Sequence, residues 1–522
     1  YCGYPYIATD NTLSGKIITG IHLGSTSQRA ISNIVTSEYL AAAMNACNLE
    51  GACLEGESLG YTDVSVEVVR GGEQIQYDNF VVEDGMLEMI SHASEGVLCD
   101  ELFEESNWLT PVGVLQKGNC TYHSPKHAFE LAPWAHKLRT PKICDLSVLV
   151  NNDSRIVNDE QLITDSRGQR NILYTQIAYH NEPKPLEDKF KLRIQKAVKI
   201  LAAEYKQVYG SEIPMLTKGQ AINSVYDPSS EYYNCLPNLE QKASTGFYVS
   251  TAFGKNTKEA LLVNVSKEGE RPWYKFADNK AANWVEQQYD NFFEYAKQGK
   301  TLLDVGKASL KSEVLKQEKV DNGLTRLFSP RGVVSTLVER RVFGAFMGKI
   351  KEQRSEGFCQ VGIDPLVDFT QLYHRFAKTG TKAICLDFKR WDKHILPELI
   401  EAAFALIYEC MKKETNTEDD QRYNSELRAI INAITQTFTV ELVFADKQLF
   451  FRTIGMPSGT VLTSVINSII NDIILYVFFV TLQVELNMAG EKINVYKEID
   501  RVHYGDDLII IVSSNITDQI IT

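Results

Sequence analysis

The stretch His503-Tyr504-Gly505-Asp506-Asp507, continued by Leu508-Ile509-Ile510-Ile511-Val512, decides how this chain of 522 residues is interpreted. Apolar and β-branched residues flank a Gly-Asp pair, which predicts two strands joined by a tight turn. The two adjacent carboxylates at such a tip can project into a cleft and bind hard divalent cations through oxygen. Gly and Asp are also common turn residues, so the stretch taken alone fits an ordinary polar turn equally well.

A second segment, Lys382-Ala-Ile-Cys-Leu-Asp387-Phe-Lys-Arg-Trp-Asp392, predicts a buried strand from Ala383 to Phe388 that ends on a carboxylate. Asp392 follows five residues after Asp387, in the turn that leaves the strand. If Asp387 lies opposite Asp506, the pair forms a two-metal site of the kind that supports in-line phosphoryl transfer. An Asp at the end of a strand is otherwise often a helix cap or a turn residue.

A third segment, Gly455-Met-Pro-Ser458-Gly459-Thr460, predicts a flexible loop that leads into a helix. On that helix Thr463, Asn467 and Asn471 recur at every fourth position, so they share one face. Three aligned polar residues on an otherwise apolar helix indicate that this face lines a polar cavity. The alternative is a set of buried amides whose hydrogen bonds are all satisfied.

In this order the three segments resemble the palm motifs of viral RNA-dependent RNA polymerases, in particular those of the picornavirus-like positive-strand group. The resemblance implies that Asp387 and Asp506 bind catalytic Mg²⁺ or Mn²⁺, with Asp507 as a weaker second carboxylate. It also implies that Ser458 and Gly459 belong to a loop that moves with the incoming nucleotide. The implied chemistry is transfer of a ribonucleotide to the 3′-hydroxyl of an RNA primer paired with an RNA template.

The same resemblance assigns sugar selection to Asp392 and Asn467, with Thr463 supporting this pair. A 2′-hydroxyl donates and accepts a hydrogen bond, and a carboxylate with an amide satisfies both roles. A reverse transcriptase would be expected to block the 2′-hydroxyl with a bulky side chain. The two residues therefore favour ribonucleotides, although a reverse transcriptase or another palm nucleotidyltransferase stays open as an alternative.

The segment Ser309 to Arg326 resembles the basic fingers motif of the same family, which contacts the triphosphate. Lys311, Lys319 and Arg326 fall on its basic positions, where cations would neutralise the triphosphate. The chain departs from the motif at three positions, Ser312, Leu315 and Leu324. The alternative is a solvated charged loop, which is common for segments rich in Lys and Glu.

The amino terminus resembles the end of a picornavirus-like cysteine protease with a chymotrypsin-type barrel. Cys2 would match its nucleophile, and His22 would match the histidine of the substrate pocket. The base and the orienting acid of that family are expected upstream of the nucleophile and are not part of this sequence. Without a base the thiol is mostly protonated, so we predict an inactive protease remnant.

We expect a mixed α/β (α+β) fold with polymerase fingers and a palm, the palm being a small antiparallel sheet backed by helices. Because only Leu508 to Thr522 follow the Asp-Asp turn, we expect the thumb to be missing and the chain to be a partial polyprotein that can be inactive as it stands. The expected segments are a protease fragment at 1–49, an acidic junction at 50–105, fingers at 106–380, and a palm at 381–522 with a fingers insertion at about 410–452.

The net charge of −13 conflicts with binding to polyanions unless the charge is unevenly distributed. Residues 50–105 hold 15 Asp or Glu and one basic residue, Arg70, which gives −14. Everything else then carries −13 − (−14) = +1. Within the acidic segment, Val64 to Val69 alternates in the pattern of a strand.

The remaining composition bounds the class of protein. The ten cysteines lack CxxC spacing and are typical of reduced intracellular thiols. The apolar run Ile469 to Leu482 is interrupted by polar residues, so a buried helix is expected and no transmembrane segment. A zinc site is a weaker alternative, because its spacing fits no standard finger. Its ligands would be Cys120, His123, His127 and His136.

The expected partners are an RNA template and primer, ribonucleoside triphosphates, a viral protein primer and other replication proteins. The expected location is the cytoplasm of the host cell, at membrane-associated replication complexes. A different class of function stays open, namely a non-catalytic RNA-binding polyprotein segment.

Overall fold

The computed structural model describes residues 5–7, 18–25, 30–33, 60–93, 98–115, 172–226, 229–230, 236–311, 325–380 and 382–515. The chain divides into two compact units, Tyr1–Ser58 and Leu59–Thr522. Cys2, Lys319 and the four residues of the zinc alternative lie outside the described residues, as does the side chain of His22.

The smaller unit contains one antiparallel sheet of three strands, β1 (Pro5–Ile7), β2 (Ile18–Ser25) and β3 (Ala30–Asn33). His22 lies on the central strand, in register with Ser32 of β3. The assignment of this unit to a protease, and the missing thumb, stay predictions.

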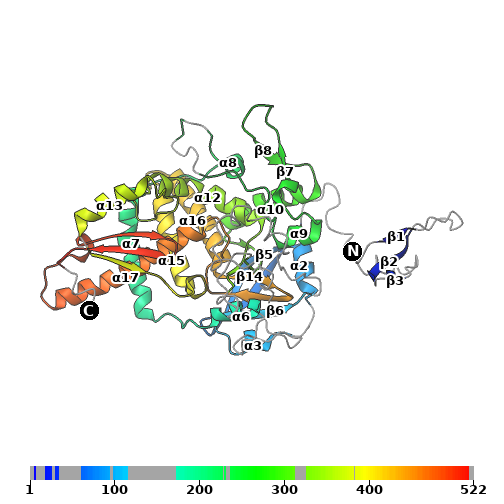
Figure 1. Cartoon of the computed structure of the whole chain (residues 1–522), viewed down its shortest axis with the longest axis horizontal. Coiled ribbons are helices and arrows are strands. Elements are labelled where there is room, and N and C mark those ends of the chain that lie inside the picture. The colour runs from blue at the N-terminus through cyan, green and yellow to red at the C-terminus, as the bar shows by residue number, and fades with distance from the viewer. Residues whose placement is uncertain are drawn as a thin grey trace, which may run out of the picture. The chain divides into compact units, whose positions relative to one another are not determined.

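The predicted palm sheet is present in the larger unit, with the strand order β13-β17-β16 (Figure 1). Its strands are β13 (Lys382–Leu386), β16 (Ile499–Tyr504) and β17 (Asp507–Val512). Both pairings are antiparallel, so the predicted hairpin and its neighbouring strand are confirmed. The predicted burial of the first strand is wrong: β13 is the edge strand among the described residues, and its Ala383 and Leu386 are exposed.

Helix α17 (Thr463–Met488) contains Thr463, Asn467 and Asn471, as predicted, and packs on β16. Its isoleucines at 466, 469, 470 and 473 are fully buried, which explains why so apolar a helix is stable in this position. Among the described residues this helix alone is long and apolar enough to cross a membrane, yet 78% of its most apolar 18-residue stretch is buried. The buried-helix interpretation therefore holds.

Three further helices support this side of the unit (Figure 1). Helices α7 (Asp188–Tyr209) and α15 (Pro397–Met411) pack on each other and on α17, while α13 (Asp368–Thr379) packs on β16 and β17. The chain then passes through α16 (Glu418–Thr439), which packs on α15.

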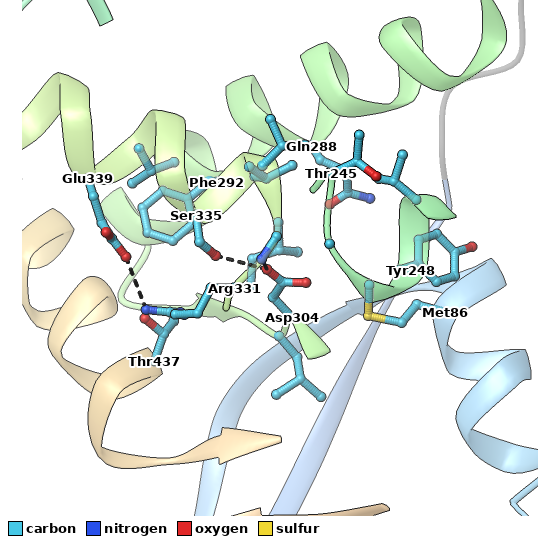
Figure 2. A pocket seen from close by; sticks show the side chains of 18 of the residues that line it. Met86, Thr245, Tyr248, Gln288, Phe292, Asp304, Arg331, Ser335, Glu339 and Thr437 are labelled. Carbon is cyan, nitrogen blue, oxygen red and sulfur yellow. Dashed lines mark hydrogen bonds and ion pairs between the residues drawn. The ribbon is translucent and has the colours of Figure 1, made fainter. Parts of the chain in front are cut away.

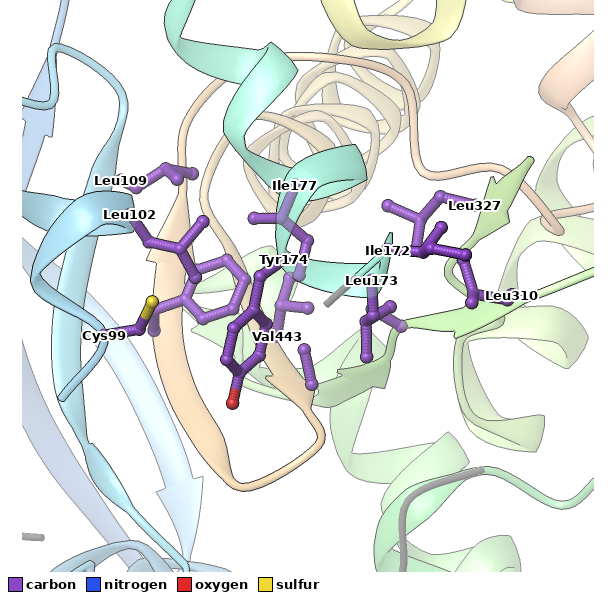
Figure 3. Close-up of a cluster of buried hydrophobic side chains, with 13 residues drawn as sticks. Cys99, Leu102, Leu109, Ile172, Leu173, Tyr174, Ile177, Leu310, Leu327 and Val443 are labelled. Carbon is purple, nitrogen blue, oxygen red and sulfur yellow. The ribbon is translucent and has the colours of Figure 1, made fainter. Parts of the chain in front are cut away.

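A second sheet joins strands that are distant in the sequence, in the order β10-β14-β15-β6. Strands β14 (Glu441–Ala445) and β15 (Gln448–Arg452) form a hairpin, flanked by β10 (Val305–Lys307) and β6 (Leu109–Val114). Figure 3 shows the apolar cluster over this sheet, where Ile172, Tyr174 and Ile177 of α6 (Ile172–Ala178) meet Leu109 and Val443. This burial fixes the strands against one another.

Part of the acidic segment folds into the larger unit. The predicted strand around Val64 to Val69 is β4 (Tyr61–Arg70), which pairs with β5 (Glu73–Glu83), and β5 pairs in turn with β9 (Thr301–Leu302). Residues 60–93 and 98–105 thus belong to the same unit as the palm sheet, and the segment boundaries expected from the sequence stay predictions. Four acids of the segment, Asp63, Glu67, Glu73 and Asp78, are exposed on β4 and β5.

The other described elements connect these sheets. They are α2 (Asp84–Ser91), α3 (Asp100–Phe103), α8 (Lys218–Asn223), α9 (Phe247–Phe253), β7 (Leu262–Asn264), β8 (Tyr274–Phe276), α10 (Lys280–Lys297), β11 (Ser309–Leu310), β12 (Leu327–Phe328), α12 (Val333–Glu352) and α14 (Trp391–His394), with short 3₁₀ turns at Tyr179–Asn181, Lys258–Leu261 and Val495–Lys497.

Candidate active site

Three of the predicted carboxylates meet at one end of the palm sheet. Tyr504 pairs with Asp507, which leaves Gly505 and Asp506 as the two-residue turn. Gly505 has a φ of 65°, a left-handed conformation that favours glycine. On the other side, Leu386 pairs with Leu508, so Asp387 leaves β13 beside the start of β17.

The charges of these carboxylates interact. Burial raises the pKa of Asp506, and the neighbouring charges of Asp507, Asp387 and Asp392 raise it further. A half-buried carboxyl that faces three others is the environment in which a bound cation would relieve repulsion. The four groups therefore fit a hard divalent metal by donor type and by charge.

The carboxylates do not form a ready-made metal cage. Among the residues that the structure describes, no three His, Cys, Asp or Glu groups are close enough to hold one ion. The sheet brings Asp387 and Asp506 to the same end.

Helix α17 holds the turn through two side chains. Ser468 Oγ accepts a hydrogen bond of 2.8 Å from the backbone N–H of Gly505. Asn471 Nδ2 donates to the carbonyl oxygen of Asp506 at 3.2 Å. Asn471 was predicted to share a helix face with Asn467, and its contact with the turn gives that face a structural role. The role of Ser468 was not predicted from the sequence.

Asn467, predicted to contact the ribose, is 6% exposed, and its Oδ1 is buried without a hydrogen-bond partner among the described residues. A buried amide oxygen without a partner is costly, so the group is available to a ligand. The hydroxyl of Thr463 lies 3.2 Å from the carbonyl oxygens of Pro457 and Thr460. The structure thus places Thr463 against the loop, and the described residues show no hydrogen bond between Thr463 and Asn467.

Beneath the turn lies a buried ionic network that sequence reasoning missed. Asp472, which is fully buried, accepts hydrogen bonds from Arg501 Nε at 2.6 Å and from the Tyr205 hydroxyl at 3.1 Å. His503 Nε2 lies 3.2 Å from the same carboxylate, without an aligned hydrogen bond. Arg501 also donates to Glu204 at 2.9 Å. The sequence signal for this network was Asp472, an acid within the apolar helix α17.

Backbone hydrogen bonds join the loop that precedes α17 to the segment from Asp392 to Ile395, which follows β13. The N–H of Met456 donates to the carbonyl oxygen of Asp392 at 2.7 Å, and the N–H of Gly455 donates to that of Ile395 at 2.8 Å. Ser458 lies at the other end of the loop, where its carbonyl oxygen accepts from the Ser329 N–H at 2.8 Å. Gly459, with a φ of 113°, lies against Pro330. The loop therefore connects the palm residues to the segment that follows Arg326.

Two of the three predicted triphosphate cations are described. The N–H of Lys311 donates to the carbonyl oxygen of Arg326 at 2.8 Å, which extends the pairing of β11 with β12. This hydrogen bond brings the backbones of the two residues together. The Lys311 residue is partly buried, whereas Arg326 is exposed.

A small pocket lies behind the same segment, with a volume of about 30 Å³, enough for one or two waters (Figure 2). Arg331 Nη1 lies 3.3 Å from Glu339 Oε1, and both side chains are buried. Burial raises the pKa of Glu339 to about 7, opposed by Arg331 and by the backbone N–H of Val461. Val461 follows the loop, so this ion pair also borders it.

Comparison with known proteins gives a consistent result. A family model for viral RNA-dependent RNA polymerase matches residues 147–521. The Polyprotein-FSD of Solenopsis invicta virus 3 is 25% identical over 446 residues, 84% of this chain and 12% of that polyprotein. The RNA1 polyprotein of Tomato black ring virus (strain MJ) is 27% identical over 305 residues, 57% of this chain and 12% of that polyprotein. The matched regions thus span about one eighth of the length of these two relatives.

A solved structure gives the same fold. The Sicinivirus 3Dpol RNA dependent RNA polymerase is similar with a TM-score of 0.52 at 17% sequence identity. The similarity covers 77% of this chain and 71% of that one. At this identity the likeness establishes the fold alone, a mixed α/β architecture with small sheets.

Proposed function

The chain belongs to the viral RNA-dependent RNA polymerase family, and on that basis we propose that it adds ribonucleoside monophosphates from NTPs to the 3′-hydroxyl of an RNA primer, directed by an RNA template. The observation that carries this proposal is the position of Asp387 and the Asp506-Asp507 pair at one end of the palm sheet. Carboxylates in that position can serve a phosphoryl transfer, because the reaction develops charge on phosphate oxygens that cations must offset.

Asp387, Asp506 and Asp507 are the residues that would hold two Mg²⁺ ions, with Mn²⁺ as a substitute. When bound, such ions activate the attacking oxygen and neutralise the leaving pyrophosphate. The protein's own contribution is to keep the carboxylates together despite their repulsion. Ser468 and Asn471 fix the backbone of the turn through hydrogen bonds, so the carboxylates are already positioned before substrate binds.

Sugar and triphosphate recognition follow from the neighbouring elements. Asp392 would accept a hydrogen bond from the 2′-hydroxyl, and Asn467 would donate one to it through Nδ2, which favours ribonucleotides over deoxyribonucleotides. Lys311, Lys319 and Arg326 would neutralise the triphosphate. Ser458 and Gly459 would move as the nucleotide binds, and their backbone ties to Ser329 and Pro330 would carry that movement to the basic segment.

A second candidate function, a non-catalytic RNA-binding segment, is favoured by one observation. The described carboxylates do not already form a three-ligand metal set. Such a segment would bind RNA but would not respond to the loss of Asp506.

The proposal extends to the setting of the protein. We infer that the chain is part of a polyprotein, with a protease-derived segment at its amino terminus in which Cys2 and His22 are the remnant residues. Replication at cytoplasmic membranes, with a protein primer and other viral proteins, belongs to the same proposal.

The test is primer extension on an RNA template with Mg²⁺ and NTPs, using the chain expressed within its polyprotein sequence. Asp506→Asn should abolish synthesis, whereas Asp419→Asn, a matched change at an exposed position of α16, should not. Synthesis that survives Asp506→Asn would overturn the assignment of the site. RNA binding without any synthesis would support the second candidate.

A further inference from the structure

Lys393 is a buried cation beside the residue proposed to read the sugar. It lies in α14, directly after Asp392, and its side chain is 6% exposed. Lysine is almost never buried unless it is paired with an acid. Its Nζ lies 3.8 Å from Asp392 Oδ2, a distance at which the two charges attract strongly in a partly dry environment.

A second acid near Lys393 already has partners of its own. Glu182 pairs with Arg390 and with His394, whose Nε2 lies 3.0 Å away. Among the described residues, Asp392 is therefore the one carboxylate within 4.0 Å of the Lys393 ammonium.

Further cations surround this lysine. Arg452 Nη1 lies 2.9 Å from His180 Nε2, and Arg390 stacks over the ring of Tyr179, 3.4 Å from its centroid. Burial, together with Arg390 and Arg452, lowers the pKa of Lys393, while Asp392 and Glu182 raise it. Burial and the neighbouring cations thus disfavour the charged form of Lys393, and Asp392 is the nearest group that stabilises it.

Asp392 lies near charges of its own sign, since its charge acts on Asp506 together with the charges of Asp387 and Asp507. Without compensation, a fourth carboxylate at this end of the sheet would turn toward a bound cation. That change would remove it as an acceptor for a hydroxyl group. The adjacent buried ammonium of Lys393 opposes it, because it attracts the Asp392 carboxylate away from the other three acids.

We propose that Lys393 is a positioning residue for sugar selection, which holds the Asp392 carboxylate apart from Asp387 and Asp506 so that it accepts the hydrogen bond of a ribose 2′-hydroxyl. This inference rests on the proposed polymerase function and adds a determinant of its specificity. The backbone bond from Met456 to Asp392 holds the main chain of that residue, so Lys393 needs to fix only the side chain.

The test compares one NTP with its 2′-deoxy analogue. Lys393→Met removes the charge at similar length, and Lys393→Arg keeps it. Loss of a charge-fixed acceptor should lower kcat/KM for the NTP about tenfold and leave that for the dNTP nearly unchanged. Lys393→Arg should restore most of the preference for ribose. Lys378→Met, an exposed position on α13, is the matched control and should behave as wild type.

The opposite results are equally clear. An equal loss for both sugars, or no change for either, would overturn the proposal, and thermal unfolding of each variant would identify a folding defect. Equilibrium binding of the NTP and the dNTP, measured by fluorescence with Mg²⁺, gives a readout that does not need synthesis. If the wild-type chain prefers the NTP but makes no RNA, the proposed function fails, while loss of that preference in Lys393→Met would still support the role of Lys393.

Discussion

Ser468 accepts the hydrogen bond of the Gly505 N–H at 2.8 Å, so a side chain of α17 fixes the backbone of the turn that carries Asp506. The bond joins residues 37 positions apart, and it is buried. Asn471, one turn further along the helix, adds a second bond to the same turn. The position of the candidate metal ligands therefore depends on the helix as well as on the sheet.

Removing this hydroxyl should impair catalysis. Ser468→Ala leaves a buried N–H without a partner, which costs about 1–3 kcal/mol, and it frees the turn to move. We expect kcat for primer extension to fall about tenfold with little change in the KM for NTP. Ser464→Ala, an exposed position on the same helix, should leave kcat unchanged. A change in KM alone would contradict this role.

Neutralising Asp506 should separate activity from stability. Asp506→Asn removes a metal ligand, and we expect synthesis to fall by roughly a hundredfold to a thousandfold or more. It also removes a half-buried charge that three other acids repel, so the melting temperature without metal should stay the same or rise. Thermal unfolding with and without Mg²⁺ checks this. A clear loss of stability without metal would show that the turn needs the charge for folding.

The network beneath the turn should dominate the stability of this region. Asp472→Ala leaves Arg501 buried without its nearest counter-charge, which costs roughly 3–5 kcal/mol. Glu204→Gln should cost less, because Glu204 is partly exposed. Denaturant unfolding monitored by tryptophan fluorescence would rank the two variants. Equal costs would show that the buried pair gives no special stability.

From the lowered pKa of Asp472 we expect the protein to lose stability in acid. Burial by itself would raise the pKa of Asp472, but Arg501 and His503 outweigh it and hold the pKa well below the usual range. A lowered pKa in the folded state gives stability that is present above the unfolded pKa of about 3.9 and is lost as the pH falls toward the folded value. Unfolding free energies measured from pH 5 downward should show this loss, which Asp472→Asn should reduce.

Glu339 predicts the opposite trend near neutral pH. Its pKa rises from 4.5 to about 7, so its contribution to stability is full below 4.5 and is lost as the pH rises through about 7. The difference corresponds to roughly 3 kcal/mol. Unfolding free energies measured between pH 5 and pH 8 should therefore fall, with a flatter slope in Glu339→Gln. Glu356→Gln, at an exposed position, should keep the wild-type slope.

The local elements of the site could be predicted from the sequence. The hairpin around Gly505 is visible because β-branched runs flank a turn pair, and the helix from Thr463 is visible because its polar residues repeat every four positions. The proximity of Asp387 to that turn required the family resemblance, because nothing local indicates that two strands more than a hundred residues apart will pair.

Other features depend on contacts that no local pattern contains. The burial of β13 was predicted from its apolar residues, but exposure is set by the strand's place at the edge of the sheet. Asp472 was visible only as an interruption of an apolar run, because Arg501 and Tyr205 come from other elements. Thr463 was predicted to support Asp392 and Asn467 in sugar selection. Its hydroxyl instead forms hydrogen bonds with the loop that precedes α17.

The pairing of β6 with β15 has a consequence for how the protein is made. Leu109 pairs with Arg452, which leaves the ribosome 452 − 109 = 343 residues later. At typical rates of synthesis the first strand waits roughly 20 to 70 seconds for its partner. During that time it is an unpaired strand at risk of association with other chains. The acids just ahead of it, Asp100, Glu101, Glu104 and Glu105, would repel such contacts, so the charge of this segment can protect the nascent chain.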